Sequence, residues 1–558
     1  MERSQRVRLL GECERIAAAG GLSRLKAAAA GAITRLDQPM RLAVVGQIKR
    51  GKSTLVNALL GTEVAATGQL ELTFTVNEFH HAPTETLRIQ LDDGTVQELP
   101  PGELREVSAR DAEDGARLRR IRKVEFGLPN ELLRTFRLVD TPGLGSVHGK
   151  DSENTADYLG ISGFVSAAEQ AGLLDVLKGM GRTAADVAAD SAAELDRADA
   201  ILYLFSRAMH ERDHTAIEQF VGSAGGAVTP LKAFGVLSRC DQYWPPAEDL
   251  PGAPDPVTYD PMEVGRRLAD EYLERPETRR LFFTVVPVAG LVGVGAQALG
   301  EEEFEWLADL AKAPPGRLVS RLSDAGLFAN RDDLTAAGIT LPKERRRALV
   351  GRIGVWGIHL ATGYLRDGLA PGQVRERLLE DSGVARLRSL AVGHFGNRAS
   401  LIKLGSGLDR LTAAITAERL AARRAEGRPA PAVAEVAALV ERIRTAEPGF
   451  AELGILAEYY NGELTFTADE VEELLRVTGE HGVGLATRLG LSGTASPADL
   501  VAAADARIKA WAVRSQDPLL ERRMADAARR ILRTYDRLAH RAEQARVLLE
   551  TDHDPEFE

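Results

Sequence analysis

Cysteine is almost absent from this chain, which has only Cys13 and Cys240 among 558 residues. Two cysteines so far apart exclude a disulfide scaffold and fit a reducing compartment, which favours a cytoplasmic protein. Runs of about 18 apolar residues are also missing. The nearest approach, residues 285–299, is short and rich in glycine and alanine. We therefore expect no membrane-spanning helix, so that any membrane contact is peripheral, at the inner face of the cell membrane.

Positive charge is in deficit, with 70 Lys and Arg against 81 Asp and Glu and a formal net charge of -11. A protein this acidic is a poor candidate for nucleic-acid binding over its whole surface, so we expect no nucleic-acid partner. Its hydrophobic content of 44% and charged content of 27% are those of a globular protein and exclude wholesale disorder. The length is too great for one core.

Short apolar runs alternate with helical patterns from residue 40 to about residue 300. This alternation is typical of a βαβ fold with a mostly parallel sheet. The runs read as strands are 42–45, 136–139, 200–205, 234–237 and 283–288.

Residues beyond about 300 follow helical spacing. The clearest apolar seam runs from Ala528 to Leu549, and Asp517-Pro518 before it has the residues of a helix N-cap and first turn. The fold class expected is an α/β head with a mostly parallel sheet plus a long helical-bundle trunk. The expected divisions are an N-terminal helix joining the trunk (1–39), the head (40–300) with a helical insert near 160–190 and a proline-rich loop near 245–261, the trunk (301–550) and an acidic tail (551–558).

A phosphate-binding loop is the strongest motif. Gly46-x-x-x-x-Gly51-Lys52-Ser53 follows an apolar strand and precedes a helical segment, as the motif requires. Glycines let backbone N–H groups face the phosphates, and the helix N-terminus adds positive potential. Lys52 is expected to reach the β- and γ-phosphates and Ser53 to bind Mg²⁺. The residues expected to contact the nucleotide here are Gly46, Gln47, Lys49, Arg50, Gly51, Lys52, Ser53 and Thr54.

The run Asp140-Thr141-Pro142-Gly143 ends the next predicted strand. An aspartate there suits contact with Mg²⁺, and the Gly143 N–H can sense the γ-phosphate. The following residue is Leu144, where many GTPases place a glutamine that orients water. Leucine cannot do so, so other segments or a second molecule must complete the site.

The base is predicted from Ser238-Arg239-Cys240-Asp241, which follows another apolar run. The guanine-reading pattern is Asn/Thr-Lys-x-Asp, in which Asp accepts two hydrogen bonds from guanine. Asp241 is in place, and Arg239 can stack on the ring as lysine does. Because Ser238 and Arg239 depart from the pattern, GTP is favoured while an adenine-tolerant pocket or an ATPase stays open.

A switch threonine is expected between the phosphate loop and Asp140, where it would complete the set of Mg²⁺ ligands. Thr73 is favoured over Thr67, although a plain strand threonine is the alternative, with Thr75 close by. The predicted Mg²⁺ ligands are therefore Ser53, Thr73 and Asp140.

Together these segments resemble bacterial dynamin-like proteins, particularly the actinobacterial isoniazid-inducible type. The resemblance rests on residues 46–61, on 140–146 and on Ala198-Asp199-Ala200-Ile201-Leu202. It implies a GTPase head on a helical trunk, with head-to-head dimerisation driving GTP hydrolysis and membrane remodelling. It also implies Thr73 as the switch threonine and the absence of the glutamine at Leu144. Because such proteins are often encoded in pairs, a sister GTPase is an alternative partner to self-assembly.

Two features depart from the family pattern. Lys49 stands where dynamins have a small polar residue and guanylate-binding proteins an arginine finger, so it is a candidate to supply positive charge in catalysis. Alternatively, Lys49 and Arg50 both point to solvent or to a partner head. The insert near 160–190 either contacts an opposing head or caps the head's own core.

Weaker signals have plainer alternatives. His80-His81 suggests a metal but fits solvent-facing strand residues better. The aromatic residues between Phe450 and Phe466 are either a membrane tip or bundle core. The basic run 343–347 either faces anionic lipid or is a solvated helix face. The leading function is a dynamin-like GTPase acting on a peripheral membrane, and the alternative is a cytosolic GTP-dependent switch or scaffold for a protein partner.

Overall fold

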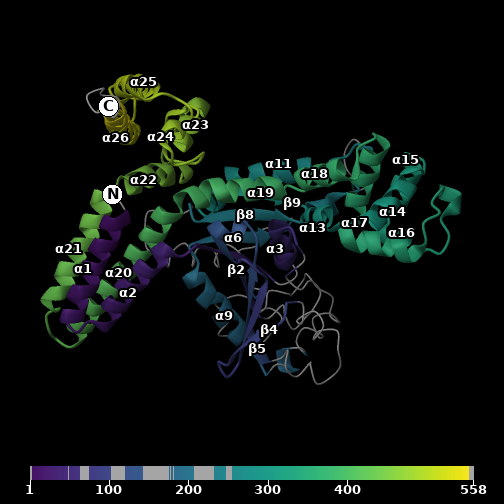
Figure 1. The fold of residues 1–558 in the computed structure, drawn as a ribbon, viewed down its shortest axis with the longest axis horizontal. Helices are drawn as coiled ribbons and strands as arrows, with labels where there is room; N and C mark the ends of the chain where they lie inside the picture. The colour runs from purple at the N-terminus through teal and green to yellow at the C-terminus, as the bar shows by residue number, and fades with distance from the viewer. Residues whose placement is uncertain are drawn as a thin grey trace, which may run out of the picture.

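The computed structural model describes residues 3–47, 50–62, 64, 75–101, 120–142, 175, 177–179, 181–206, 231–246 and 254–551. Within these ranges, one nine-stranded sheet lies at the centre, and helices pack on it and extend beyond it on two sides (Figure 1). The strand order is β4-β3-β5-β2-β6-β1-β7-β8-β9. The strands are β1 (Met40–Gly46), β2 (Val76–His81), β3 (Thr86–Leu91), β4 (Val96–Leu99), β5 (Ile121–Leu128), β6 (Phe136–Asp140), β7 (Ala200–Phe205), β8 (Ala233–Ser238) and β9 (Thr284–Val288).

The prediction of a mostly parallel sheet is confirmed. Strands β6, β1, β7, β8 and β9 pair in parallel, and these are the five strands that apolar runs predict. The antiparallel pairings involve β2 to β5, which the sequence does not predict. The reason is clear in β3, where exposed and buried residues alternate, so no continuous apolar run forms.

Two cores lie on opposite faces of the sheet, because successive side chains of a strand point to opposite sides. On β1, Leu42 and Val44 belong to one core, and Ala43 and Val45 belong to the other. The first core contains α3 (Lys52–Leu60), α6 (Leu132–Thr135) and α19 (Val384–Ala391). The second contains α9 (Ala184–Arg197), α11 (Pro261–Glu274), α13 (Gly290–Ala298), α14 (Glu301–Ala311), α15 (Pro315–Leu322), α16 (Ala325–Asn330), α17 (Lys343–Arg366) and α18 (Pro371–Asp381). Short turns add α12 (Pro276–Arg279), η2 (Cys240–Tyr243) and η3 (Thr335–Ala337).

A separate bundle carries the N-terminus. A third core, the only one in this bundle among the described residues, lies between α1 (Arg3–Ala19), α2 (Ser23–Asp37), α20 (Asn397–Arg424) and α21 (Pro431–Ala446). The segment predicted as one N-terminal helix over residues 1–39 is two helices. The break falls at Gly20-Gly21, where Gly21 has a positive φ of 68° and a Cβ on Gly20 would lie 2.8 Å from Ala432 Cβ.

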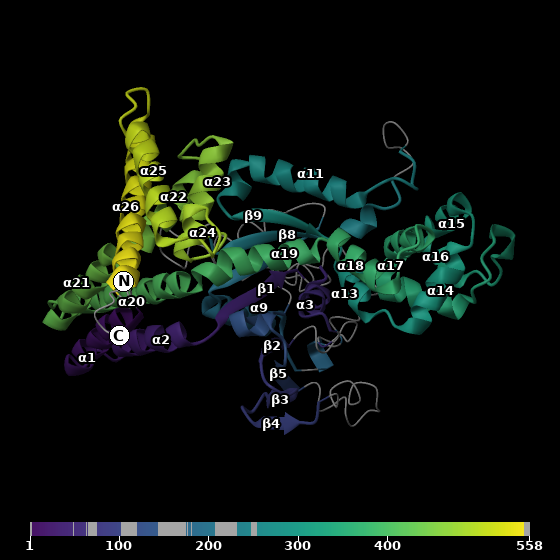
Figure 2. The same cartoon turned by 45° about the horizontal axis from the view of Figure 1, so that its top comes forward.

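The C-terminal helices are α22 (Pro448–Tyr460), α23 (Ala468–Val477), α24 (Leu485–Leu489), α25 (Pro497–Ser515) and α26 (Arg522–Thr551). The α25–α26 hairpin projects from the molecule, with its connecting turn at the top of Figure 2. The prediction that Asp517 caps α26 is wrong, because α26 begins at Arg522. Asp517 instead accepts a hydrogen bond from the Leu519 N–H at 3.0 Å within that turn.

The aromatic residues near Tyr460 do not form an exposed tip, because Tyr459, Tyr460 and Phe466 are half-buried and pack against the first core. The Tyr460 ring lies 4.4 Å from that of Phe283, directly before β9, and the rings of Tyr459 and Phe466 are 5.9 Å apart. The most exposed large apolar side chains in the described structure are instead Leu519 (92%) and Val513 (75%), at the end of the α25–α26 hairpin.

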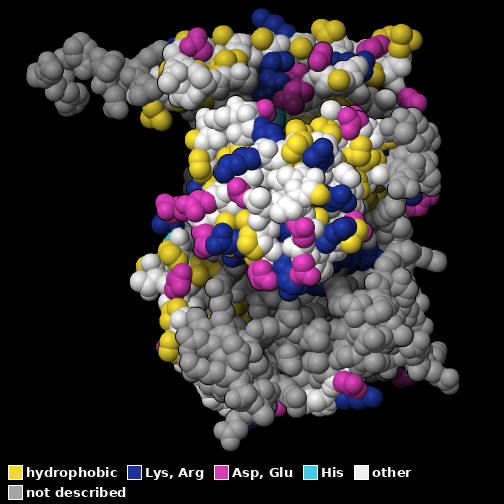
Figure 3. All heavy atoms as spheres, turned by 90° about the vertical axis from the view of Figure 1, so that its right-hand side faces the viewer, with side chains coloured by type: hydrophobic (Ala, Val, Ile, Leu, Met, Phe, Trp, Pro, Cys, Tyr) yellow, Lys and Arg dark blue, Asp and Glu magenta, His cyan; other side chains and the backbone are white. Residues whose placement is uncertain are grey.

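The basic run at the start of α17 does not form a patch of one sign. Lys343 pairs with Asp332, and Arg346 is buried. Figure 3 views the molecule from the end that α14–α17 form, and there Lys and Arg side chains are mixed with Asp and Glu. Among the helices described, none is long and apolar enough to cross a membrane.

Candidate functional site

The phosphate loop begins at the carboxyl end of β1 and leads into α3. Gly46 has φ 153°, and a Cβ there would lie 2.6 Å from the Leu204 carbonyl oxygen. Gly51 precedes α3 with a left-handed φ of 89°. Both positions therefore need glycine, one for close approach to β7 and the other for backbone conformation. This geometry points the first N–H groups of α3 at the space above the loop.

Lys52 is a buried cation folded back on the loop. Its Nζ donates to the carbonyl oxygens of Gly46 and Gln47, both at 3.1 Å. Burial, opposed by the charge of Asp140 and aided by that of Arg50, lowers the pKa of Lys52 to about 8. A cation desolvated to this degree gains strongly from an anion placed beside it, as phosphate oxygens would be.

Ser53 and Asp140 form the second part of the site. Ser53 Oγ donates to Asp140 Oδ2 at 2.6 Å, while Oδ1 of Asp140 is buried without a hydrogen-bond partner among the described residues. Burial raises the pKa of Asp140, against the influence of Lys52 and Ser53. An unpaired carboxylate oxygen beside a hydroxyl is a donor set that fits Mg²⁺.

Arg50 does not point to solvent. Its side chain is 5% exposed, donates through Nη2 to Gln47 Oε1 at 3.0 Å, and donates through Nη1 to Ser206 Oγ just after β7. The interpretation that Arg50 points to solvent or to a partner head is therefore wrong. Lys49 lies outside the described residues, as do Thr67, Thr73, Gly143 and Leu144.

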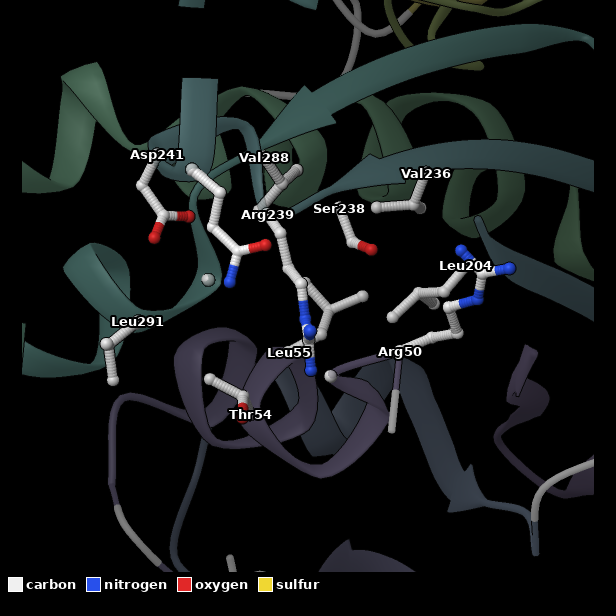
Figure 4. Close-up of a pocket in the computed structure, with 13 residues that line it drawn as sticks. Arg50, Thr54, Leu55, Leu204, Val236, Ser238, Arg239, Asp241, Val288 and Leu291 are labelled. Carbon is white, nitrogen blue, oxygen red and sulfur yellow. The ribbon is translucent and has the colours of Figure 1, made fainter. Parts of the chain in front are cut away.

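A pocket of about 220 Å³ opens beside the loop, at the carboxyl ends of β7, β8 and β9 (Figure 4). Asp241 and Arg239 come from the segment after β8, and Thr54 comes from α3. Burial raises the pKa of Asp241, with the nearby Arg239 opposing. In Figure 4 the Arg239 side chain extends from the β8 end toward α3, across the pocket. The pocket thus offers a carboxylate for hydrogen-bond donors and a planar cation for a ring.

The Ser238 hydroxyl forms a hydrogen bond with the protein backbone. It donates to the Phe205 carbonyl oxygen at 3.1 Å, which fixes the start of the base segment to the end of β7. Arg239 then has a positive φ of 61°, a conformation that is uncommon for residues other than glycine. Such local strain is often found at binding sites.

Two pocket neighbours have no signal in the sequence. Leu291, at the start of α13, lines the pocket together with Gly290, which follows the last predicted strand. Gly354 breaks α17 with φ 69°, and a Cβ there would lie 4.0 Å from Asp241 Oδ2. A helix more than a hundred residues further along the chain therefore reaches the base segment, and only the tertiary fold brings it there.

The His80-His81 pair carries no metal site in the part of the chain that the structure describes. Both residues are half-buried on β2, and His81 Nδ1 lies 3.3 Å from the Asn130 carbonyl oxygen. No group of three His, Cys, Asp or Glu side chains able to hold a metal occurs among the described residues.

The phosphate loop and Asp140 lie in a segment that matches a known protein family, whereas Asp241 lies beyond that segment. Residues 42–219 match the Dynamin family. The isoniazid-induced protein IniC of Mycobacterium tuberculosis is 28% identical over 513 residues, which cover 90% of each chain. Dynamin-like protein 2 of Campylobacter jejuni is 29% identical over 129 residues, or 22% of this chain and 20% of that one. A solved oligomerised bacterial dynamin pair, described as sensing and tethering membranes, aligns with 98% of this chain and 92% of its own at 12% identity, with a TM-score of only 0.30.

Proposed function

Because the chain is a bacterial dynamin-like protein with a GTPase head, we propose that it holds GTP with Mg²⁺ between the phosphate loop and Asp241, and that hydrolysis is coupled to a peripheral membrane. The observation that carries the metal-dependent part is the buried, unpaired Oδ1 of Asp140 beside Ser53. A buried carboxylate oxygen without a partner is costly, and a cation would satisfy it.

Each described residue has one task in this proposal. Lys52 exchanges its two carbonyl partners for phosphate oxygens, and the N–H groups of the loop hold the same phosphates. Ser53 and Asp140 would hold Mg²⁺, which neutralises charge on the phosphates when bound. Asp241 accepts hydrogen bonds from the guanine edge, and Arg239 covers the ring.

The remaining parts of the catalytic site are proposed from the sequence alone. Thr73 joins the metal ligands, Gly143 contacts the γ-phosphate, and Lys49 adds positive charge at the phosphates. Leu144 cannot orient water, so a second head completes the site, from another copy of this chain or from a sister GTPase. Movement of the helical region then follows from pairing of the heads.

GTP turnover measured against chain concentration tests the pairing. Specific activity is expected to rise with concentration, because only paired heads are complete. Lys52→Ala controls for contaminating activity and is expected to be inactive at every concentration. A specific activity that is flat over a hundredfold range of concentration would contradict pairing while leaving GTP hydrolysis in place.

The α25–α26 turn is the proposed membrane contact. Leu519 in the turn and Val513 near the end of α25 are exposed apolar side chains, and the turn projects away from the rest of the molecule (Figure 2). Arg514, Arg522 and Arg523 lie close to it in sequence. Apolar side chains flanked by arginine suit the surface of an anionic bilayer, on the cytoplasmic side.

Sedimentation with vesicles containing phosphatidylglycerol, with and without GTP, tests this contact. The chain is expected to sediment with vesicles, and Leu519→Glu is expected to reduce the bound fraction severalfold. Leu327→Glu is the matched control, since Leu327 is 49% exposed on the distant α16. Sedimentation that never exceeds the protein-only level would contradict the membrane proposal and favour a GTP-dependent switch acting on a protein partner.

A further inference from the structure

The end of β7 receives side chains from both halves of the nucleotide site. Strand β7 lies between β1, which leads into the phosphate loop, and β8, which leads into the base segment. Ser206, directly after β7, accepts a hydrogen bond from Arg50 Nη1. The preceding residue, Phe205, accepts one from Ser238 Oγ at 3.1 Å. Adjacent residues of one strand end are therefore fixed to the two loops that a nucleotide would bridge.

Arg50 also fixes the loop internally. Its Nη2 donates to Gln47 Oε1 at 3.0 Å, so one guanidinium joins the first half of the phosphate loop to β7. The side chain is buried, and Figure 4 shows it turned toward Leu204 and away from Asp241. Its position is that of a brace at one edge of the pocket, which it lines on the side away from Asp241.

A guanidinium is suited to this task by its geometry. Its N–H donors are held in a rigid planar fork, so two acceptors bound by one arginine keep a fixed separation. An ammonium on a flexible stem has the same charge without that geometry. The contacts form a continuous path from Ser238 through Phe205 and Ser206 to Arg50 and Gln47.

We propose that Arg50 is a positioning residue that couples base recognition to phosphate placement. The proposal rests on the function above, in which the pocket takes a guanine nucleotide. Contacts at Asp241 are made in full only when the phosphates sit at the correct distance in the loop. Loss of the brace lets the phosphates bind while the base is poorly seated, so selectivity for the base falls more than phosphate affinity does.

The competing role for Arg50 is that of a simple charge. Arg50 already lowers the pKa of Lys52, so its field reaches the phosphate site. A charge-only role predicts that every nucleotide is affected alike and that Arg50→Lys restores binding. A positioning role predicts a specific loss of base selectivity that Arg50→Lys does not restore.

Equilibrium titration of the full chain with GDP and IDP separates the two roles. IDP lacks the exocyclic amino group from which Asp241 would accept a hydrogen bond, so the ratio of the dissociation constant for IDP to that for GDP reports base reading alone. Arg50→Met is expected to reduce this ratio about tenfold, which is about 1.4 kcal/mol. Ser206→Ala removes only one acceptor of the brace and is expected to reduce the ratio severalfold, and it decides the matter if Arg50→Met does not fold.

Arg346→Met is the matched control. Arg346 is also buried and donates to backbone carbonyls of Leu341 and Arg331, far from the nucleotide site. This variant is expected to lower thermal stability without changing the ratio of the dissociation constant for IDP to that for GDP. Equal weakening of both nucleotides in Arg50→Met and Ser206→Ala, or full rescue by Arg50→Lys, would overturn the proposal. Failure of the wild-type chain to bind GDP would instead overturn the proposed function on which it rests.

Discussion

Ser53 Oγ lies 2.6 Å from one oxygen of the Asp140 carboxylate, while the other oxygen is buried without a partner among the described residues. Thr141, next in the chain, donates through Oγ1 to the Val44 carbonyl oxygen at 3.0 Å and ties the strand end to β1. The carboxylate is therefore held rigidly in an unfavourable environment. Retention of such a group is readily understood if a cation binds it during function.

Asp140→Asn is expected to stabilise the nucleotide-free chain and to lower its GTP turnover. Because the cost of burying the Asp140 charge outweighs its attraction to Lys52 and Ser53, removing it should raise the free energy of unfolding of the nucleotide-free chain by about 1 kcal/mol. Mg²⁺-dependent GTP turnover should fall by at least about a hundredfold, since a metal ligand and its charge are lost. Denaturant unfolding and steady-state turnover of the same preparation measure both effects.

Glu78→Gln is the control for that prediction, because Glu78 is equally buried but paired. Its carboxylate contacts Arg41, Lys123 and Arg137 at 2.7–3.1 Å. Removing its charge takes one partner from each of three cations, although Arg41 keeps Glu194 and Lys123 keeps Glu125, and should destabilise the chain by about 3 kcal/mol. Destabilisation by Asp140→Asn of the same size would show that Asp140 is an ordinary structural carboxylate.

Gly46→Ala is expected to abolish nucleotide binding. A Cβ at Gly46 would lie 2.6 Å from the Leu204 carbonyl oxygen, which belongs to backbone that cannot move without distorting β7. Gly11→Ala is the matched substitution, since a Cβ at Gly11 in α1 meets nothing within 4 Å. Calorimetric titration with GDP should give no heat for Gly46→Ala and wild-type affinity for Gly11→Ala. Undiminished binding by Gly46→Ala would show that the close approach of Gly46 to β7 is not needed for nucleotide binding.

Glu480 joins the sheet to the helical region through a buried cluster. It lies 3.0 Å from His394 Nδ1 and pairs with Arg398, while His394 Nε2 donates to the Leu231 carbonyl oxygen at 2.9 Å. Burial opposes ionisation of Glu480, but His394 and Arg398 outweigh it and hold the pKa at about 2. Burial lowers the pKa of His394.

Glu480→Gln is therefore expected to destabilise the chain by about 3–5 kcal/mol at neutral pH, by leaving Arg398 unpaired. Because the pKa of Glu480 in the folded state is lowered, its contribution is present above about pH 4.5 and is lost as the pH falls toward about 2. The difference in denaturant midpoint between wild type and variant should be constant from pH 8 to 5 and shrink below 4.5. The exposed Glu441→Gln should show no such difference, and a Glu480→Gln difference that grows with acidification would refute this account.

The sequence predicts the parallel half of the sheet well because those strands are buried on both faces and read as apolar runs. The sequence does not predict strands β3 and β4, because exposed residues interrupt any apolar run in them. The start of α26 is mispredicted because Asp517 can cap a turn as well as a helix, and only the backbone geometry of the hairpin decides between them.

The site is predictable to the extent that it is local. Gly46, Gly51, Lys52 and Ser53 are fixed by one loop, and a motif suffices to find them. The brace from Arg50 to Ser206 joins residues 156 positions apart, so its existence depends on β1 and β7 being neighbours. The approach of Gly354 to Asp241 depends on a kink in α17 that no sequence periodicity indicates.

We propose that Asp241 makes this head a guanine-nucleotide hydrolase, and steady-state turnover of GTP, XTP and ATP by the wild type and Asp241→Asn is the decisive measurement. The carboxylate accepts the two donors of the guanine edge, whereas an asparagine amide matches the donor and acceptor of xanthine. Wild type is predicted to prefer GTP, and Asp241→Asn to lose about a hundredfold in kcat/KM for GTP while gaining turnover of XTP. Equal turnover of ATP and GTP by the wild type, unchanged by Asp241→Asn, would contradict the account.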